Sequence, residues 1–270
     1  MGEPFVYGVS QGVGLLRVPQ LERLGFACCM STRIGGVSTG ETATMNLSFK
    51  RRDSEENVRE NYRRLAAAMD RPLESLCLSR QVHGIEVLEA TADDAYRSLT
   101  PGAVSREGDA WISDDPALTL IRHHADCTPV YLADPEHKAM ALIHAGWKGT
   151  VNCITQLTAE AMFRRYGTRP ENLLAVIGPA IDKCCFEIGP DVITLLEEGF
   201  PGDHLVLEHD GSTYGDLKRC NWLQLTRLGV LPENILISEL CTACHTDLLY
   251  SHRKEKGHTG IMASAMYLLP

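Results

Sequence analysis

The chain has 270 residues, of which 44% are hydrophobic and 23% are charged, as in an ordinary globular protein. At this length about 75% of the extended-chain surface is buried on folding, so the chain can fold on its core alone. No apolar run approaches the roughly 18 residues of a membrane span, and MGEPFVYGVSQGVG lacks the regions of a signal peptide. We therefore expect neither an integral membrane protein nor an exported one.

The charges and the cysteines narrow the class of protein further. With 26 Lys and Arg against 35 Asp and Glu, the net charge is −9. No dense basic cluster is present, so we expect no nucleic acid and no membrane surface among the partners. The 10 cysteines are too dilute for a disulfide scaffold and predict reduced thiols in a cytoplasmic enzyme.

The first half of the chain predicts short strands and one long helix. Residues 13–18 and 25–32 have the pattern of short strands and lead into the glycine-bearing turn STRIGGVSTG. Asp53 and Glu56 have the spacing of a capping box, which predicts a helix from about Asp53. The apolar face of that helix consists of Val58, Tyr62, Leu65 and Met69. A strand is predicted around Ser79–Val82, and the alternating segment GIEVLEA follows it.

The second half alternates buried strands with helices. LTLIRHHADCTPVYLAD predicts two strands around a polar interruption, and AMALIHAGWKG predicts a buried strand that runs into a glycine turn. A helix should follow to Tyr166 and stop at Gly167, a position that glycine favours. LLAVIGP predicts another strand, and DVITLLEE predicts another helix. Because strict βαβ alternation is lacking, we predict an α+β fold in a single catalytic domain over residues 1–270.

Polar residues interrupt the apolar runs at three places that could carry chemistry. QVHG places His83 at a turn, and ADCTP places Asp126 and Cys127 at the end of a strand. In IHAGWKG a strand ends in His144 and passes through glycines into a helix. The backbone N–H groups around Gly146–Gly149 would then favour an anion, because they lie at the N-terminus of that helix.

Each of these residues has an ordinary structural alternative. A single strand histidine is usually part of the hydrogen-bonded framework, and a single buried cysteine is usually packing. Taken together, His83, Cys127 and His144 are a mixed nitrogen and sulfur set that suits zinc, although their spacing is not a local metal motif. Three protein ligands would leave a fourth position open, as a catalytic zinc site needs.

A longer series of motifs resembles one known family. TRIGGVSTG, MNLSF, NYRRL, QVHG, GDAWISDDP, ADCTPV, HAGWKG, IGPAI, FEIGPDV, CT and LYSHR occur in this order. From about residue 13 to 268 the chain resembles the laccase-domain family, also called multicopper polyphenol oxidase, peptidoglycan editing factor and purine nucleoside phosphorylase. The pair ADCTPV and HAGWKG is its most specific part. The resemblance implies two packed β-layers flanked by helices, an αββα sandwich with mixed sheets.

The resemblance also implies a metal site and a reaction. One ion per chain, Zn²⁺ rather than copper, would be held by His83, Cys127 and His144. The implied activities are phosphorolysis of adenosine, inosine and 5′-methylthioadenosine, and deamination of adenosine. Purine nucleosides and phosphate would be the partners of a monomer or a homodimer. Asp126 could orient a ligand or move a proton, and Asp109 of GDAW could support a ligand from behind.

Substrate contacts are expected among polar residues of the same motifs. Arg33, Lys148 and Arg253 are candidates for holding phosphate, and Asn46 of MNLSF is a candidate for contacting the substrate. Surface salt bridges are the alternative for the arginines, and a turn or a cap is the alternative for Asn46. Two positions depart from the family pattern, because Lys148 and Ile261 both stand where an arginine is common. Lys148 keeps the positive charge but loses the two-point geometry of arginine. At Ile261 the role of that arginine, in structure or in anion binding, must be absent or supplied elsewhere.

Two other patterns are set aside. Cys241-Thr-Ala-Cys244-His245 has the form of a c-type haem site, but haem attachment requires export. As a second zinc site or redox pair it lacks a cysteine pair that follows at the usual spacing, so Cys241 and Cys244 are assigned to packing. His123 and His124 suggest copper, but 10 histidines are too few for a multicopper cluster.

Two functions from other classes stay open. One is a Cys/His hydrolase that edits peptidoglycan precursors, with Cys127 as the nucleophile and His83 or His144 as the base. The other is a non-catalytic partner protein with a structural metal, which an open fourth position disfavours. Dependence on added phosphate and on the metal separates the phosphorylase from the hydrolase.

Overall fold

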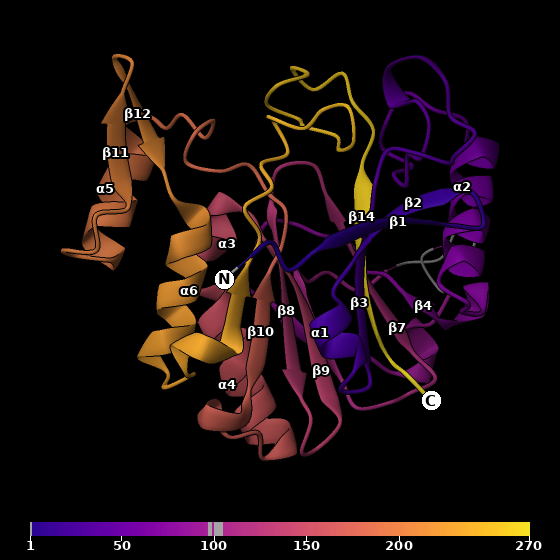
Figure 1. Cartoon of the computed structure of the whole chain (residues 1–270), viewed down its shortest axis with the longest axis horizontal. Helices are drawn as coiled ribbons and strands as arrows, with labels where there is room; N and C mark the ends of the chain where they lie inside the picture. Colours follow the sequence, from indigo (N-terminus) through magenta and orange to yellow (C-terminus); the bar gives the residue numbers. More distant parts are fainter. Residues whose placement is uncertain (1, 97–98, 100–104) are drawn as a thin grey trace.

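The computed structural model describes residues 2–96, 99 and 105–270. Within this part of the chain the strands form two six-stranded mixed sheets and one two-stranded sheet (Figure 1). The first sheet has, in spatial order, β1 (Val6–Ser10), β2 (Val13–Arg17), β3 (Phe26–Ser31), β14 (Met262–Leu268), β7 (Thr119–His124) and β4 (Leu76–Cys77). The second has β13 (Ile235–Ile237), β10 (Leu174–Ile177), β8 (Thr128–Asp134), β9 (Ala139–Ala145), β6 (Ala110–Ser113) and β5 (Val87–Glu89). The small sheet pairs β11 (Val206–His209) with β12 (Ser212–Gly215).

The helices of the described residues are α1 (Pro19–Glu22), α2 (Glu55–Ala68), α3 (Trp147–Val151), α4 (Ile154–Tyr166), α5 (Pro190–Gly199) and α6 (Leu217–Arg227). Of these, α2, α4 and α6 cover the outer faces of the two large sheets. α2 packs on the first sheet, where Leu65 shares a buried cluster with Leu15. α4 and α6 pack on the second sheet, on the opposite side of the molecule, where Met162 and Leu225 share a cluster with Ile143 (Figure 1).

The inner faces of the two large sheets meet in the main core. Met30 and Leu120 of the first sheet share one buried cluster with Tyr131 and Leu142 of the second. Side chains of a strand point alternately to the two faces of its sheet, so β3, which is buried along its whole length, contributes to the core and to the α2 side in turn. The layers run helix, sheet, sheet, helix, which confirms the predicted α+β sandwich.

Most of the predicted elements are present, and three differ from the prediction. The first two predicted strands are β2 and β3. α2 begins at Glu55, because Ser54 rather than Asp53 caps it by accepting the N–H of Asn57 at 3.1 Å. The strand predicted around Ser79–Val82 is wrong, since this segment is a loop that follows β4. Only Arg80 of this segment pairs in β fashion, through an isolated parallel bridge to Glu107, whereas Gln81 and the N–H of Val82 bind side-chain or single backbone partners.

The helix predicted after the strand of His144 is divided into α3 and α4. The break lies at Cys153, whose φ of 61° is left-handed and interrupts the helical hydrogen bonding. α4 ends at Tyr166, and Gly167 caps it in the left-handed conformation with φ of 75°, as predicted. None of the helices in the described residues has both the length and the apolar composition needed to span a membrane.

Candidate metal centre

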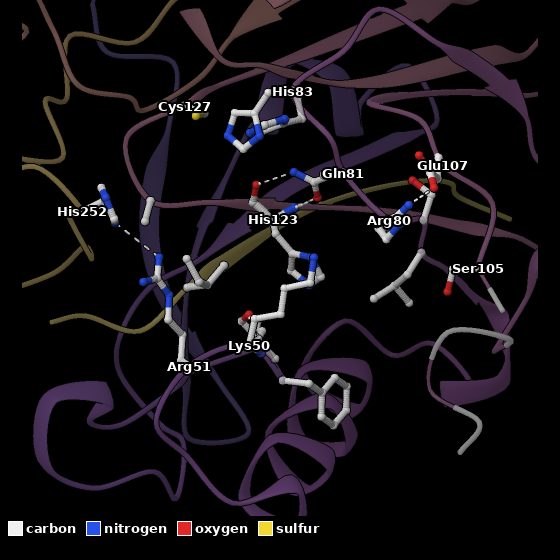
Figure 2. A pocket seen from close by; sticks show the side chains of 18 of the residues that line it. Lys50, Arg51, Arg80, Gln81, His83, Ser105, Glu107, His123, Cys127 and His252 are labelled. Atoms are coloured by element: carbon white, nitrogen blue, oxygen red, sulfur yellow. Dashed lines mark hydrogen bonds and ion pairs between the residues drawn. The ribbon is translucent and has the colours of Figure 1, made fainter. Parts of the chain in front are cut away.

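Three strand ends bring His83, Cys127 and His144 together. His83 lies in the loop after β4, Cys127 in the turn between β7 and β8, and His144 near the end of β9. Their ligating atoms all lie within 4.8 Å of one another, close enough to bind one ion (Figure 2). β7 lies in the first sheet and β8 and β9 in the second, so the cluster forms where the two layers meet.

Asp109 holds two of the three ligand residues from behind. Its buried carboxylate accepts the backbone N–H of Val82, His83 and Gly84, each at 3.0 Å. It also accepts a hydrogen bond from Nδ1 of His144 at 2.8 Å, which leaves Nε2 of that ring free to bind a metal. This is the place that the supporting carboxylate of a metal site occupies.

The loop that carries His83 is tied to β7 by a side chain instead of by strand pairing. Gln81 accepts the N–H of His123 at 2.7 Å and donates to its carbonyl oxygen at 3.0 Å (Figure 2). His83 itself has a left-handed φ of 58°, which turns the chain and aims the ring at Cys127 and His144. These contacts explain why Ser79–Val82 does not form the predicted strand.

Gly146 of HAGWKG is required by the close packing of the three ligand residues. A Cβ atom at this position would lie 3.0 Å from Cδ2 of His83, 3.2 Å from Sγ of Cys127 and 3.6 Å from Cε1 of His144. The backbone of Gly146 therefore forms one wall of the ligand cluster. A side chain there would push apart the three groups that could hold an ion.

The electrostatics of the cluster favour a bound cation. Burial, together with the charges of Asp126 and Asp109, raises the pKa of the Cys127 thiol to about 12. Burial likewise lowers the pKa of His144, so its ring is neutral at pH 7. Although burial opposes it, hydrogen bonds from His144 and from the backbone lower the pKa of Asp109 to about 2. Neutral imidazoles and a thiol that needs a positive charge to ionise fit a divalent metal ion.

The cluster lies on the wall of a pocket of about 890 Å³, a size typical of small-molecule sites. Apolar side chains line one part of the pocket: Leu47, Phe49, Tyr62, Leu78 and Ile261. Basic side chains also line the pocket: Arg51 and His252 lie together on one side, and Arg80 lies across from them, paired with Glu107 (Figure 2). Lys50 lies between them (Figure 2). The pocket therefore offers an apolar surface, positive charge and a candidate metal site within reach of one small molecule.

The residues predicted to contact substrate lie outside this pocket lining. The guanidinium of Arg33 binds the carbonyl oxygen of Thr246 at 2.5 Å and pairs with Glu255 at 3.2 Å. Asn46 is fully buried and donates to Asp53 at 2.9 Å. In this structure both side chains bind neighbouring segments of the chain.

Lys148 and Arg253 are exposed, and they also lie outside the pocket lining. Lys148 lies over the ring of Trp147, and Arg253 donates to the carbonyl oxygen of Glu187 at 2.8 Å. The carboxylate of Asp126 accepts the hydroxyl of Thr242 at 2.6 Å and the N–H of Arg253 at 2.7 Å. Asp126 therefore positions the segment before Cys127 instead of facing the pocket.

Lys50, Arg51, His123 and His252 are pocket residues that sequence reasoning did not assign to the site. Lys50 and Arg51 directly follow the motif MNLSF, and this proximity is the signal that could have found them. Arg51 donates to the carbonyl oxygen of Gly257 at 3.1 Å and lies 3.4 Å from Nδ1 of His252. Burial lowers the pKa of Arg51, which nevertheless stays a cation at neutral pH.

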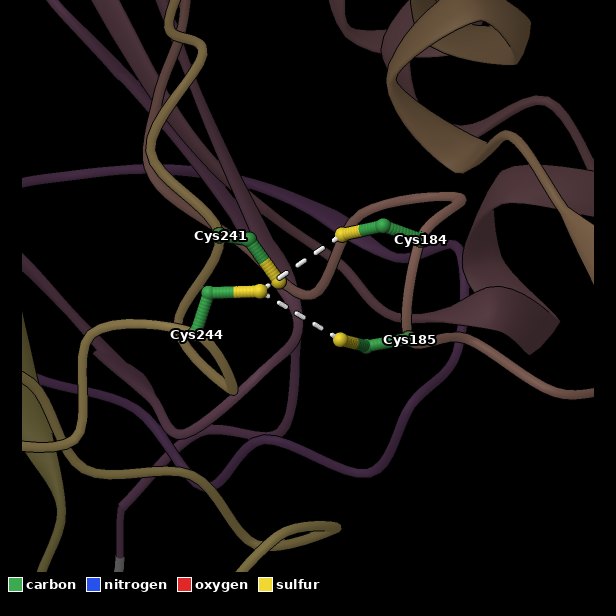
Figure 3. A group of neighbouring side chains, drawn as sticks. All are labelled: Cys184, Cys185, Cys241 and Cys244. Atoms are coloured by element: carbon green, nitrogen blue, oxygen red, sulfur yellow. Dashed lines mark hydrogen bonds between the residues drawn. The ribbon is translucent and has the colours of Figure 1, made fainter.

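The structure also changes the interpretation of Cys241 and Cys244. A cysteine pair from upstream, Cys184 and Cys185, lies beside them (Figure 3). Cys184 and Cys244 are exposed, which does not fit the packing role predicted for the CxxC pair. A zinc ribbon would place its second cysteine pair after this motif, whereas the fold brings a pair from earlier in the chain.

Comparisons with known proteins agree with this architecture. Residues 27–269 match the family described as multi-copper polyphenol oxidoreductase laccase. The chain is 38% identical over 253 residues to a protein of Deinococcus radiodurans named purine nucleoside phosphorylase, covering 94% of this chain and 92% of that one. It is 33% identical over 253 residues to purine nucleoside phosphorylase YlmD of Geobacillus stearothermophilus, covering 92% of each. The crystal structure of YlmD from that organism matches with a TM-score of 0.93 at 31% identity over 100% of both chains.

Proposed function

This chain belongs to the multi-copper polyphenol oxidoreductase laccase family, and from that premise we propose that it is a zinc-dependent purine nucleoside phosphorylase. The observation that carries the proposal is the open cluster of His83, Cys127 and His144 on the wall of a pocket with apolar and basic sides. The names of the relatives supply the reaction class. We propose adenosine, inosine and 5′-methylthioadenosine as substrates, and deamination of adenosine as a second activity.

His83, Cys127 and His144 would hold one zinc ion per chain. Their nitrogen and sulfur atoms are ligands that zinc accepts, and three of them leave a position open. When bound, zinc supplies Lewis-acid chemistry, including the activation of water that a deaminase needs. A reducing compartment, the cytoplasm expected from the sequence, belongs to the same proposal because the Cys127 sulfur must stay unoxidised to bind a metal.

Different residues of the remaining pocket lining would bind the two substrates. The purine would lie against the apolar side formed by Phe49 and Leu78, and phosphate would bind near Lys50, Arg51 and His252. In phosphorolysis a phosphate oxygen bonds to C1′ of the ribose as the bond from C1′ to the purine nitrogen breaks. The bond electrons leave with the purine, which takes up a proton, and ribose 1-phosphate is released.

Because residue 261 is apolar, Lys50 and Arg51 become the main candidates for binding the anionic co-substrate. Ile261 lines the pocket and stands where the family commonly has an arginine. An anionic co-substrate still requires positive charge, and Lys50 and Arg51 of the same pocket lining could supply it. We therefore assign to these two residues the anion contact that the sequence analysis sought at Lys148 and Arg253.

The rival peptidoglycan hydrolase is disfavoured by the environment of Cys127. Burial raises the pKa of the Cys127 thiol and lowers the pKa of His144, and both shifts oppose the thiolate and imidazolium pair that a cysteine hydrolase needs. A non-catalytic role for the metal is disfavoured by the open ligand set.

The test measures base release from inosine as the phosphate concentration is raised. We expect cleavage to rise from near zero to saturation, with ribose 1-phosphate formed in equal amount to hypoxanthine. A strong chelator should stop the reaction, and added Zn²⁺ should restore it. Phosphate-independent base release, or activity on a peptide substrate that survives chelation, would overturn the proposal.

A further inference from the structure

Four cysteines outside the pocket lie together at the ends of two neighbouring strands. Cys184 and Cys185 belong to the loop after β10, and Cys241 and Cys244 to the loop after β13. β10 and β13 pair in parallel, with Ile177 opposite Ile237, so both loops leave the same edge of the sheet. We call these four residues the cysteine quartet. Their sulfur atoms all lie within 4.8 Å of one another (Figure 3).

The spacing of the sulfur atoms matches a tetrahedral thiolate site. Sγ of Cys244 lies 3.7 Å from Sγ of Cys184 and 3.5 Å from Sγ of Cys185. Zinc binds thiolate sulfur at about 2.3 Å, which places the sulfurs of a tetrahedron about 3.8 Å apart. A disulfide would require about 2.0 Å. The quartet has the separation of ligands around one ion, and all four thiols are free.

The backbone of both loops is shaped to present these sulfurs. In the second loop the N–H of Cys244 donates to the carbonyl oxygen of Cys241 at 3.2 Å, which closes a tight CxxC turn. In the first loop the N–H of Cys185 donates to the carbonyl oxygen of Asp182 at 2.8 Å. The N–H of Asp182 also donates to Sγ of Cys241 at 3.4 Å, a contact that stabilises a sulfur carrying negative charge.

We propose that the cysteine quartet binds a second zinc ion, distinct from the ion of the pocket and structural in role. Four thiolates fill the tetrahedral coordination of zinc, so no position is left for substrate or water. Binding displaces the thiol protons to solvent and leaves the metal and the sulfurs in their original oxidation states. The proposal does not depend on the reaction assigned to the pocket.

The second zinc would complete a clamp between the two loops. The buried ammonium of Lys218 already joins them at one end, because it donates to Asp182 of the first loop at 2.7 Å and to the carbonyl oxygens of Ser238 and Leu240 before the second. Thr242, inside the CxxC turn, donates to Asp126 at 2.6 Å. Asp126 precedes Cys127, so the quartet also supports the strand end that carries a pocket ligand.

The first test counts zinc in the full-length protein, loaded with Zn²⁺ under a reductant and then desalted. We expect about two ions per chain, and about one in the double variant Cys241→Ser, Cys244→Ser. Cys153→Ser is the matched control, because Cys153 is a free cysteine outside both clusters, and it should retain about two. Zinc content that is the same in the double variant and in the unchanged protein would overturn the proposal.

The second test reports which ligands bind. Cobalt loaded into the Cys127→Ala variant should show the strong thiolate-to-cobalt absorption of a four-sulfur site, and the additional quartet substitutions should abolish it. If a quartet variant fails to fold, alkylation of the unchanged protein tests the proposal instead. Zinc should slow the modification of exposed Cys184 and Cys244 at least about tenfold, and a chelator should restore it. Alkylation unaffected by zinc, or a disulfide at Cys244 in protein isolated under reductant, would contradict the proposal.

Discussion

The pocket cluster and the cysteine quartet are two metal-type sites built by the same fold in different ways. In the pocket, His83, Cys127 and His144 converge on one point and leave a coordination position open. In the quartet, four sulfurs surround a point and would close it. The number of protein ligands thus separates a site suited to chemistry from a site suited to holding loops together.

The two sites also differ in what orients their ligands. Asp109 fixes the pocket cluster with four hydrogen bonds, and Gly146 leaves room for the ligands to meet. The quartet has short backbone turns instead, and Cys184 and Cys244 are exposed to solvent. A catalytic site needs ligands that are placed before the metal arrives, whereas a structural ion can itself bring its loops into order.

Removing one sulfur from each site should test most clearly whether the two sites have different roles. Cys127→Ala should lower kcat/KM for inosine phosphorolysis by at least about a thousandfold, roughly 4 kcal/mol of transition-state stabilisation, because it removes a ligand at the reaction site. Cys244→Ser should lower the melting temperature and change kcat/KM by less than about tenfold, since it acts only through Thr242 and Asp126. Steady-state kinetics beside thermal unfolding measures both effects. Equal losses of activity would show that the two sites do not have separate roles.

Asp109 tests whether the pocket cluster depends on its supporting carboxylate. Asp109→Asn should weaken zinc binding by about 10- to 100-fold, because the amide cannot accept from both the backbone and His144 as the carboxylate does. Competition with a chromophoric chelator measures the affinity. The matched control is Asp134→Asn, since Asp134 is equally buried and binds His137 at 2.8 Å far from the metal ligands. The control should lose stability and keep its zinc affinity, and a similar loss of affinity in both variants would remove the special role of Asp109.

A smaller effect is expected when one cation is removed, and it should distinguish Arg51 from Lys148 as the residue that binds phosphate. Arg51→Ala should raise the KM for phosphate by roughly 10- to 100-fold, the loss of one charge-assisted contact of about 1.5–3 kcal/mol. Lys148→Ala should change that KM by less than about twofold, because its ammonium is exposed and lies over Trp147 outside the pocket lining. Titration of both variants with phosphate measures the two KM values and shows which residue binds phosphate. A large effect at Lys148 with none at Arg51 would restore the assignment made from the sequence.

The sequence was informative wherever a short stretch of chain carries the whole signal. β2 and β3 follow from their apolar pattern, and Gly167 ends α4 because glycine adopts the left-handed conformation without strain. His83, Cys127 and His144 could be named because each stands in a distinctive motif of a recognisable family. The same local signals predicted a strand at Ser79–Val82, where hydrogen bonds from Asp109 and Gln81 prevail.

What the sequence by itself determined is therefore the family and the order of layers, because each motif that carries the resemblance is a short run of neighbouring residues. The same motifs predict His83, Cys127 and His144 as metal ligands, and the fold brings these three residues together. Only the tertiary structure decided which cations face the ligands and which cysteines meet. Cys184 approaches Cys244 because β10 and β13 pair in parallel and send their loops from one edge, although the two residues are far apart in the chain. Strand pairing is a long-range choice made by the packing of the whole core, so residues such as Lys50 and Arg51 acquire their place only when the sheets close around them.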